Sequence, residues 1–78
     1  MAAHCLDVRG LLCPMPVIRT QARVNQLAPG EELEILVTDP GALRDIPAWC
    51  RVHGHEVIAT EEGRDETTIW VRVGGAAP

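Results

Sequence analysis

The sequence has no lysine, phenylalanine or tyrosine, and Trp49 and Trp70 are its only tryptophans. A protein that binds single-stranded nucleic acid needs aromatic side chains to stack bases and positive charge to hold phosphates. The chain has little of either, because eleven acidic residues outnumber seven arginines and give a formal net charge of -4. The composition therefore argues against direct nucleic-acid binding and against binding to an acidic membrane surface.

Long apolar runs are also missing. No stretch approaches the ~20 apolar residues that cross a bilayer. The N-terminal segment carries Asp7 and Arg9 where a signal peptide has its apolar region. We therefore expect a cytoplasmic protein without membrane contact. The 78 residues suit one domain, and we expect an ordered core over about residues 4–73 and a flexible tail over residues 74–78.

The cysteines do not form a familiar pattern. There are three of them, Cys5, Cys13 and Cys50, and no C-x-x-C motif. An odd number in a chain of cytoplasmic character is not a disulfide framework. Cys50 lies on the inner stripe of an expected helix and is predicted to be core, whereas Cys5 alternates away from the apolar side of an expected strand and is predicted to be partly exposed.

The apolar periodicity predicts six elements in the order strand, helix, strand, helix, strand, strand. Pro47 is unfavourable inside a helix, so the regular part of the second helix is expected to begin near residues 44–46. A hairpin loop is expected over residues 61–65. The expected elements cover residues 5–9, 14–27, 32–38, 42–53, 55–60 and 67–73.

This order predicts an α+β fold, a two-layer βαβαββ sandwich in which two helices lie on one face of a four-stranded mixed sheet. The first two strands should be parallel, with a right-handed crossover, and the last two antiparallel. The other sheet face is then bare, and this is either the contact surface of a homodimer or a face with scattered apolar side chains. Alternation predicts that it carries Leu36, Ile58 and Trp70 beside Thr38, Thr60 and Arg72.

The chemistry is expected at the run Cys13-Pro14-Met15-Pro16. Pro14 disfavours a helical Cys13 and suits the first helical position itself, so Cys13 is the predicted N-cap. Unpaired N–H groups at a helix start favour thiolate over thiol, with Arg9 and Arg19 as candidates for further positive potential. The sequence thus predicts a nucleophile that needs no general base. The alternative is that Cys13 only fills space, although serine, threonine, aspartate and asparagine are the usual N-caps.

Two other motifs carry less weight. Cys50, His53 and His55 offer three zinc-type ligands, but helix spacing turns Cys50 inward, so we expect no metal site and no cofactor. Gly74-Gly75 is similar to the end of carriers that are thiocarboxylated on a terminal glycine, and Ala76-Ala77-Pro78 is expected to block that chemistry unless the tail is trimmed.

Several blocks of the chain together resemble the TusA/SirA family of sulfur carriers. The likeness extends over about residues 4 to 73, and its blocks lie at the family's spacing. They are Leu6-Asp7, Gly10-Leu11, Cys13-Pro14-Met15-Pro16, Pro29-Gly30-Glu31, Thr38-Asp39-Pro40-Gly41, Arg44-Asp45-Ile46-Pro47, Trp49-Cys50 and Gly54-His55-Glu56.

The resemblance implies a sulfurtransferase that accepts sulfane sulfur as a persulfide on Cys13 and passes it to an acceptor protein. It implies a site shaped by Pro14 and Pro16. The donor would be a protein such as a cysteine desulfurase or rhodanese, and the pathway transfer RNA thiolation, molybdenum cofactor supply or sulfur oxidation. Arg9, Arg19 and Arg23 are the candidate partner-docking residues, in place of the lysines common in the family.

Two other functions stay open at this point. The chain could be a binding or regulatory module of the same fold in which Cys13 has no chemical role. It could also be a thiol redox sensor that pairs Cys13 with Cys5.

Overall fold

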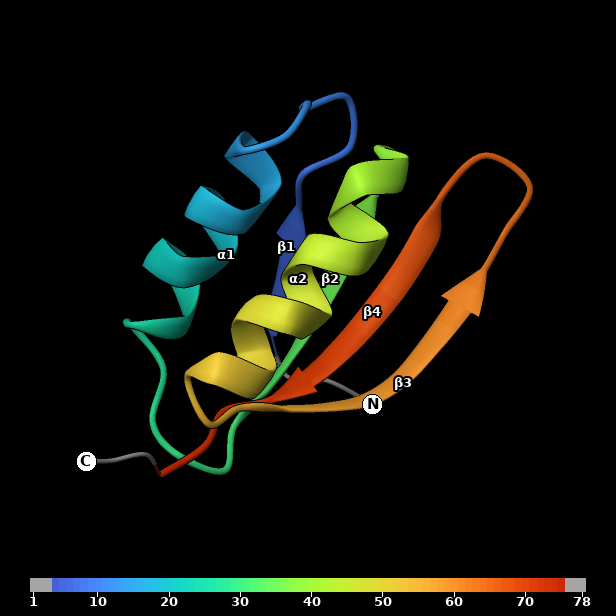
Figure 1. The fold of residues 1–78 in the computed structure, drawn as a ribbon. Helices are drawn as coiled ribbons and strands as arrows, with labels where there is room; N and C mark the ends of the chain where they lie inside the picture. The colour runs from blue at the N-terminus through green and yellow to red at the C-terminus, as the bar shows by residue number, and fades with distance from the viewer. Residues whose placement is uncertain (1–3, 76–78) are drawn as a thin grey trace.

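A computed structural model describes residues 4–75 of the chain and shows the predicted element order (Figure 1). Residues 76–78 of the expected tail lie outside the described residues. The six elements are β1 (His4–Asp7), α1 (Met15–Val24), β2 (Glu32–Val37), α2 (Pro40–Val52), β3 (Glu56–Glu62) and β4 (Thr67–Arg72).

The strands form one mixed sheet in the order β1-β2-β4-β3. β1 and β2 run parallel, with Leu6 opposite Ile35, and both β2 and β3 run antiparallel to β4. Both helices lie on the same face of the sheet (Figure 1). The predicted two-layer α+β sandwich is therefore confirmed, including the parallel first pair and the antiparallel last pair.

The core is formed by apolar residues that occupy alternate positions along β2 and β4, the two central strands of the sheet. Leu33, Ile35 and Val37 of β2 are fully buried, and so are Ile69 and Val71 of β4. Burying each of these side chains contributes about 1.5–3 kcal/mol. The helices cover this face with a smaller apolar set, which comprises Val24 of α1 and Ala42, Ile46 and Cys50 of α2. The prediction that Cys50 is core is confirmed.

The second helix begins earlier than predicted. α2 starts at Pro40, where a proline suits the first turn, and it continues through Pro47. Pro47 removes one backbone donor and costs roughly 3 kcal/mol inside a helix. The helix persists because Ile46 and Cys50, one turn apart around the proline, are both completely buried against the sheet. Tertiary packing outweighs the local penalty, so the expected late start near residues 44–46 was wrong.

Three of the six residues predicted for the open sheet face are confirmed there, and one is not. Leu36, Trp70 and Arg72 lie there, because they alternate with the buried residues of β2 and β4. Thr60 instead faces the helices, since a β-bulge between Val57 and Ala59 shifts the alternation of β3 and sets Thr60 opposite buried Ile69.

The expected element ends also need small corrections. α1 ends at Val24, three residues early, and β3 runs on to Glu62, which leaves a shorter hairpin closed by Gly63 N–H donating to Glu66 O at 2.7 Å. Across residues 4–75, no helix has the length and apolar character needed to cross a membrane.

Candidate functional site

Cys13 lies in the loop between β1 and α1, immediately before the helix. The helix begins at Met15 and its N-cap is Pro14, so the prediction that Cys13 is the N-cap was wrong by one residue. The reason is a tight turn ahead of the helix, in which Met15 N–H donates to Leu12 O at 2.9 Å. The Cys13–Pro14 peptide bond is cis, and Pro16 takes a buried position in the first helical turn.

A second helix start lies beside the first. Because β1 and β2 are adjacent and parallel, their carboxyl ends meet at one edge of the sheet, and the chain enters α1 and α2 at the same end of the molecule (Figure 1). Gly10 N–H donates to Thr38 Oγ1 at 2.8 Å and so joins the two loops. Cys13 N–H donates to Asp39 Oδ2 at 3.2 Å, and Asp39 is the N-cap of α2. The thiol thus lies at the junction of two helix starts.

The sulfur has a hydrogen-bond partner that the sequence analysis missed. Cys13 is exposed, and its Sγ–H donates to Asp45 Oδ2 on α2 at 3.1 Å. This hydrogen bond is the largest cause that raises the pKa of Cys13; desolvation and the charges of Asp45 and Asp39 raise it further. The prediction of a thiol with a lowered pKa was therefore wrong, because two carboxylates that the prediction did not include lie near the sulfur.

The sequence did carry a signal for these two carboxylates. Asp39 directly precedes Pro40, and an aspartate before a first-turn proline is a common helix start. The predicted parallel pairing of the first two strands already places the loop before that start next to the loop that holds Cys13. Asp45 has a weaker signal, since only the position of α2 over the sheet shows that its side chain reaches the sulfur.

The helix starts themselves stay open to an anion. Neither α1 nor α2 has a side chain that caps its N-terminus by a hydrogen bond, and neither has an acidic residue in its first turn. The unpaired N–H groups of both helices therefore keep their partial positive charge. A negatively charged sulfur at Cys13 would gain from this field once its proton has left.

Three large apolar side chains close to Cys13 in the sequence are exposed. Leu12 is 71% exposed, Ile18 50% and Met15 36%, and all three lie within five residues of Cys13 along the chain. Exposed apolar side chains next to a reactive atom are typical of a contact surface rather than of a closed active site. We call Leu12, Met15 and Ile18 the apolar rim.

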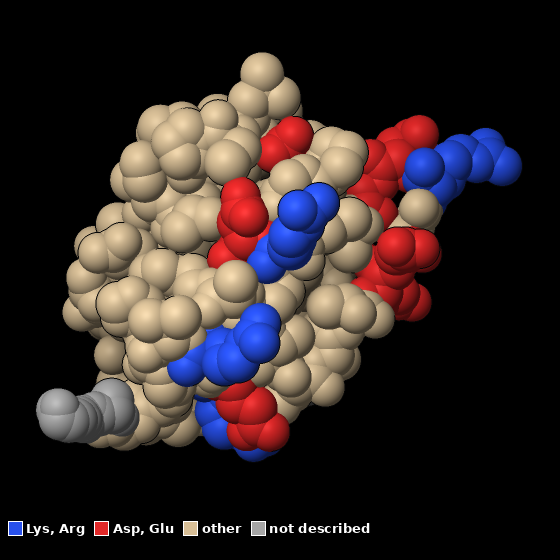
Figure 2. Space-filling view, in the orientation of Figure 1, with Lys and Arg blue, Asp and Glu red and all other residues tan. Residues whose placement is uncertain are grey.

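The three arginines predicted for docking lie in different settings. Arg9 is paired with Asp7 at 2.8 Å and with Glu66 at 2.9 Å, and hydrogen bonds from the side chain and the backbone of Arg9 lower the pKa of Asp7 to about 2. Arg19 is exposed on α1, whereas Arg23 is half-buried. In Figure 2 basic and acidic side chains alternate through the middle and right of the view, the left part over α1 is almost entirely uncharged, and no continuous basic patch is seen.

The remaining cysteine and histidine residues lie apart from this site. Trp49 packs against His53 and His55, with ring centroids 4.9 and 5.2 Å apart. His55 Nδ1 accepts a hydrogen bond from Gly74 N–H at 2.9 Å. Among residues 4–75, no three histidine, cysteine or acidic side chains are grouped as metal ligands would be.

Cys5 is exposed, as predicted, but the sheet separates it from Cys13. It pairs with Glu34, whose neighbours in β2 are buried toward the helices, so Cys5 faces the open side. Cys13 contacts α2 on the other side of the sheet. The structure does not bring these two thiols together.

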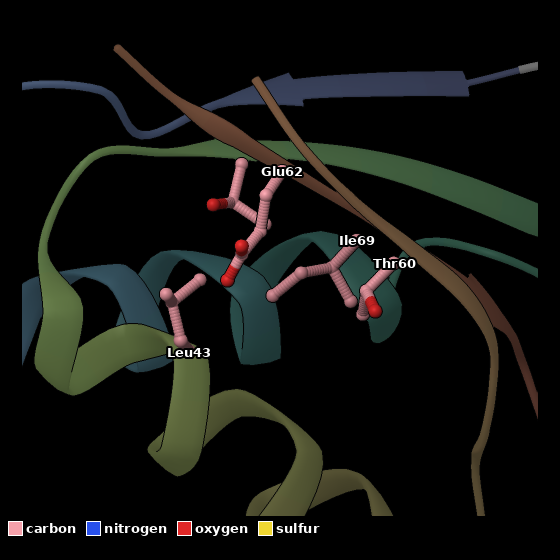
Figure 3. Close-up of a pocket in the computed structure, with 5 residues that line it drawn as sticks. Leu43, Thr60, Glu62 and Ile69 are labelled. Carbon is pink, nitrogen blue, oxygen red and sulfur yellow. The ribbon is translucent and has the colours of Figure 1, made fainter. Parts of the chain in front are cut away.

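A cleft of about 180 Å³ lies between α2 and the β3–β4 hairpin (Figure 3). Its lining contains no cysteine, histidine or basic side chain, and consists of Leu43, Thr60, Glu62, Thr67 and Ile69. The cleft therefore offers no thiol and no positively charged side chain that could bind an anion.

The fold and the site define a small α+β domain that presents one proline-flanked cysteine at its surface. Comparison with known families makes this specific: the family model described as Sulfurtransferase TusA matches residues 4–73. The chain belongs to this family, and the resemblance noted in the sequence is confirmed.

Individual relatives agree. The chain is 42% identical to a sulfur carrier protein TusA of Pseudomonas paraeruginosa, over 86% of this chain and 85% of the relative. It is 39% identical to the putative sulfur carrier protein YrkI of Bacillus subtilis, over 88% and 92%. It is 43% identical to the putative sulfur carrier protein YrkF of the same organism over 95% of the chain, which spans only 40% of YrkF.

A solved structure supports the fold. The crystal structure of a SirA-like protein from Desulfitobacterium hafniense superposes with a TM-score of 0.72, covering 91% of this chain and 97% of that one. At 20% sequence identity the similarity concerns the fold alone.

Proposed function

We propose that this protein is a sulfur carrier that accepts sulfane sulfur as a persulfide on Cys13 and relays it to an acceptor protein. The observation that carries the proposal is an exposed cysteine sulfur at the junction of two open helix starts, next to the apolar rim. The names of the family and of its relatives support the same role.

The transfer needs one cysteine and no oxidant. The Cys13 sulfur attacks the terminal sulfur of a donor persulfide, a new S–S bond forms, and the S–S bond of the donor breaks. The net change converts a Cys13 thiol and a donor persulfide into a Cys13 persulfide and a donor thiol. An acceptor cysteine then takes the terminal sulfur by the same exchange, which restores the Cys13 thiol. Between the two steps the uncapped helix starts favour a persulfide anion at Cys13, whereas the carboxylates of Asp45 and Asp39 oppose it.

Both reaction partners are proteins in this proposal, which is therefore a sulfurtransferase activity of the carrier kind. The donor is a cysteine desulfurase or rhodanese, and the acceptor belongs to transfer RNA thiolation, molybdenum cofactor supply or sulfur oxidation in the cytoplasm. The apolar rim together with Arg19 and Arg23 forms the docking surface, on α1 and the loop before it. Arg9 has a lesser part in docking because Asp7 and Glu66 already neutralise it.

The test is sulfur loading from a protein donor. The carrier is incubated with a cysteine desulfurase and ³⁵S-labelled cysteine, and protein-bound label is measured without reductant. We expect label on the wild type and on Cys5→Ser, and none on Cys13→Ser; reductant should release it. Equal labelling of Cys13→Ser and wild type would contradict the proposal.

One observation favours a second candidate. The raised pKa of Cys13 is what a binding module with an unreactive thiol would also show. In that case Cys13→Ser would bind the partner as the wild type does, and neither protein would take up sulfur.

A further inference from the structure

Asp45 stands out because its side chain is the hydrogen-bond partner of the Cys13 sulfur. It is a half-buried residue of α2, and its Oδ2 lies 3.1 Å from Cys13 Sγ. A surface thiol that only fills space needs no carboxylate partner. Across residues 4–75, no basic side chain is hydrogen-bonded to this sulfur.

The other charged groups near the sulfur do not offset the negative charge of Asp45. Asp39, the N-cap of α2, binds the Cys13 backbone N–H and adds a second negative charge. The first turn of α1 carries no charged side chain, and Arg9 in the β1–α1 loop is paired with Asp7 and Glu66. Asp45 is thus the charged group in direct contact with Sγ, and Asp39 is the next.

We propose that Asp45 is a further catalytic residue, which holds the proton of Cys13 in the free carrier and thereby decides when the sulfur becomes a nucleophile. A thiol that donates to a carboxylate stays protonated, because loss of the proton would leave two anions side by side. Since the thiolate is the reacting form, the free carrier reacts slowly with small electrophiles. This inference rests on the proposed function for its biological meaning, but not for its physical test.

The proton can be followed through the reaction. In the free carrier it lies on Sγ and is shared with Asp45 Oδ2. When Sγ attacks the donor persulfide, the proton leaves Sγ, the new S–S bond forms, and the donor sulfur departs as a thiolate. That thiolate takes up the proton, so Asp45 ends as the carboxylate it was before. Nothing is oxidised or reduced overall.

The test is the pH dependence of Cys13 alkylation by iodoacetamide in the folded wild type and in Asp45→Asn, both carrying Cys5→Ser. Asn keeps the shape of the side chain and removes its charge. We expect the pH midpoint of the variant to fall by about one unit or more. At pH 7 each unit raises the thiolate fraction about tenfold and lowers its nucleophilicity about threefold, a net gain of roughly three- to fourfold.

The two rate profiles should then cross. Above both midpoints each protein is fully thiolate, and the less basic thiolate of Asp45→Asn should react about threefold more slowly for each unit of lowered pKa. A merely structural role of Asp45 would not produce this crossing. Asp45→Glu retains a carboxylate and should keep a midpoint near that of the wild type.

The matched control is Asp65→Asn, which removes the same charge from the exposed β3–β4 hairpin and should leave the profile unchanged. An Asp45→Asn midpoint equal to or above that of the wild type would overturn the inference. Loading from glutathione persulfide separates the two proposals. A shifted midpoint without sulfur uptake by either protein would reject the proposed function and keep the role of Asp45. Sulfur uptake with an unshifted midpoint would do the reverse.

Discussion

Cys13 and Cys50 are the same residue type in opposite settings, and both have a raised pKa. Cys50 is completely buried in the core, and burial raises its pKa to about 11. Cys13 is exposed, and a hydrogen bond to Asp45 is the main cause of its raised pKa. Burial can be reversed only by unfolding, whereas a neighbouring carboxylate can be neutralised in the folded protein. A raised pKa therefore accompanies an inert thiol at Cys50. At Cys13 it accompanies a thiol whose protonation can change while the protein stays folded.

The largest expected difference between the two cysteines is their accessibility to reagents. Cys50 can react only when the protein opens, and an opening free energy of about 5 kcal/mol would make it react several thousandfold more slowly than a freely accessible thiol. Even with its slowed thiol, Cys13 should be alkylated at least about a hundredfold faster than Cys50 in native protein. Peptide-resolved iodoacetamide kinetics measure both rates, and denaturing urea should bring them together. Similar native rates would show that the core is not closed around Cys50.

Replacing each cysteine by serine should separate stability from function. In Cys50→Ser a hydroxyl enters an apolar core, which costs about 1–3 kcal/mol of unfolding free energy. Cys13→Ser changes an exposed side chain and should cost less than about 0.5 kcal/mol. Urea unfolding followed by tryptophan fluorescence gives both values, and the folded Cys50→Ser protein should still load sulfur on Cys13. An equal loss of unfolding free energy in the two variants would contradict the expectation that Cys50 contributes more to stability than Cys13 does.

Alkaline pH should lower the free energy of unfolding, because Cys50 loses its proton at a lower pH in the unfolded chain than in the folded protein. Its folded pKa of about 11 lies above the ordinary thiol value of 9.0, so the stability it contributes is complete below pH 9 and is lost as pH rises toward 11. Two pKa units correspond to about 2–3 kcal/mol at most. Cys50→Val keeps the core apolar and of similar size. Between pH 8 and pH 10.5 the unfolding free energy of the wild type should therefore fall more than that of Cys50→Val. Parallel decreases in the two proteins would rule out Cys50 as the cause.

The fold followed from the sequence because its elements carry strong local signals. Leu33, Ile35 and Val37 alternate cleanly, and such a pattern fixes both a strand and the face that it buries. The exceptions occurred where tertiary packing overrides local preference. Pro47 is held inside a helix by the core contacts of Ile46, and a bulge turns Thr60 to the helix side.

The site was predicted in part. The run of prolines around Cys13 indicated the residue that we propose to be reactive, and its exposure agrees with that role. Its protonation could not be predicted, because the decisive contact joins Cys13 to Asp45, 32 positions along the chain. Helix starts are visible in a sequence, but a carboxylate that approaches from another helix is visible only once the layers are packed.

The central claim is that Cys13 carries the transferred sulfur. The most direct measurement is intact and peptide mass spectrometry of the wild-type protein after incubation with glutathione persulfide, followed by addition of an excess of an acceptor thiol. The account predicts one added sulfur atom, located on the peptide that contains Cys13, and its removal by the acceptor. Absence of any added sulfur, or its location on Cys5 alone, would contradict the account.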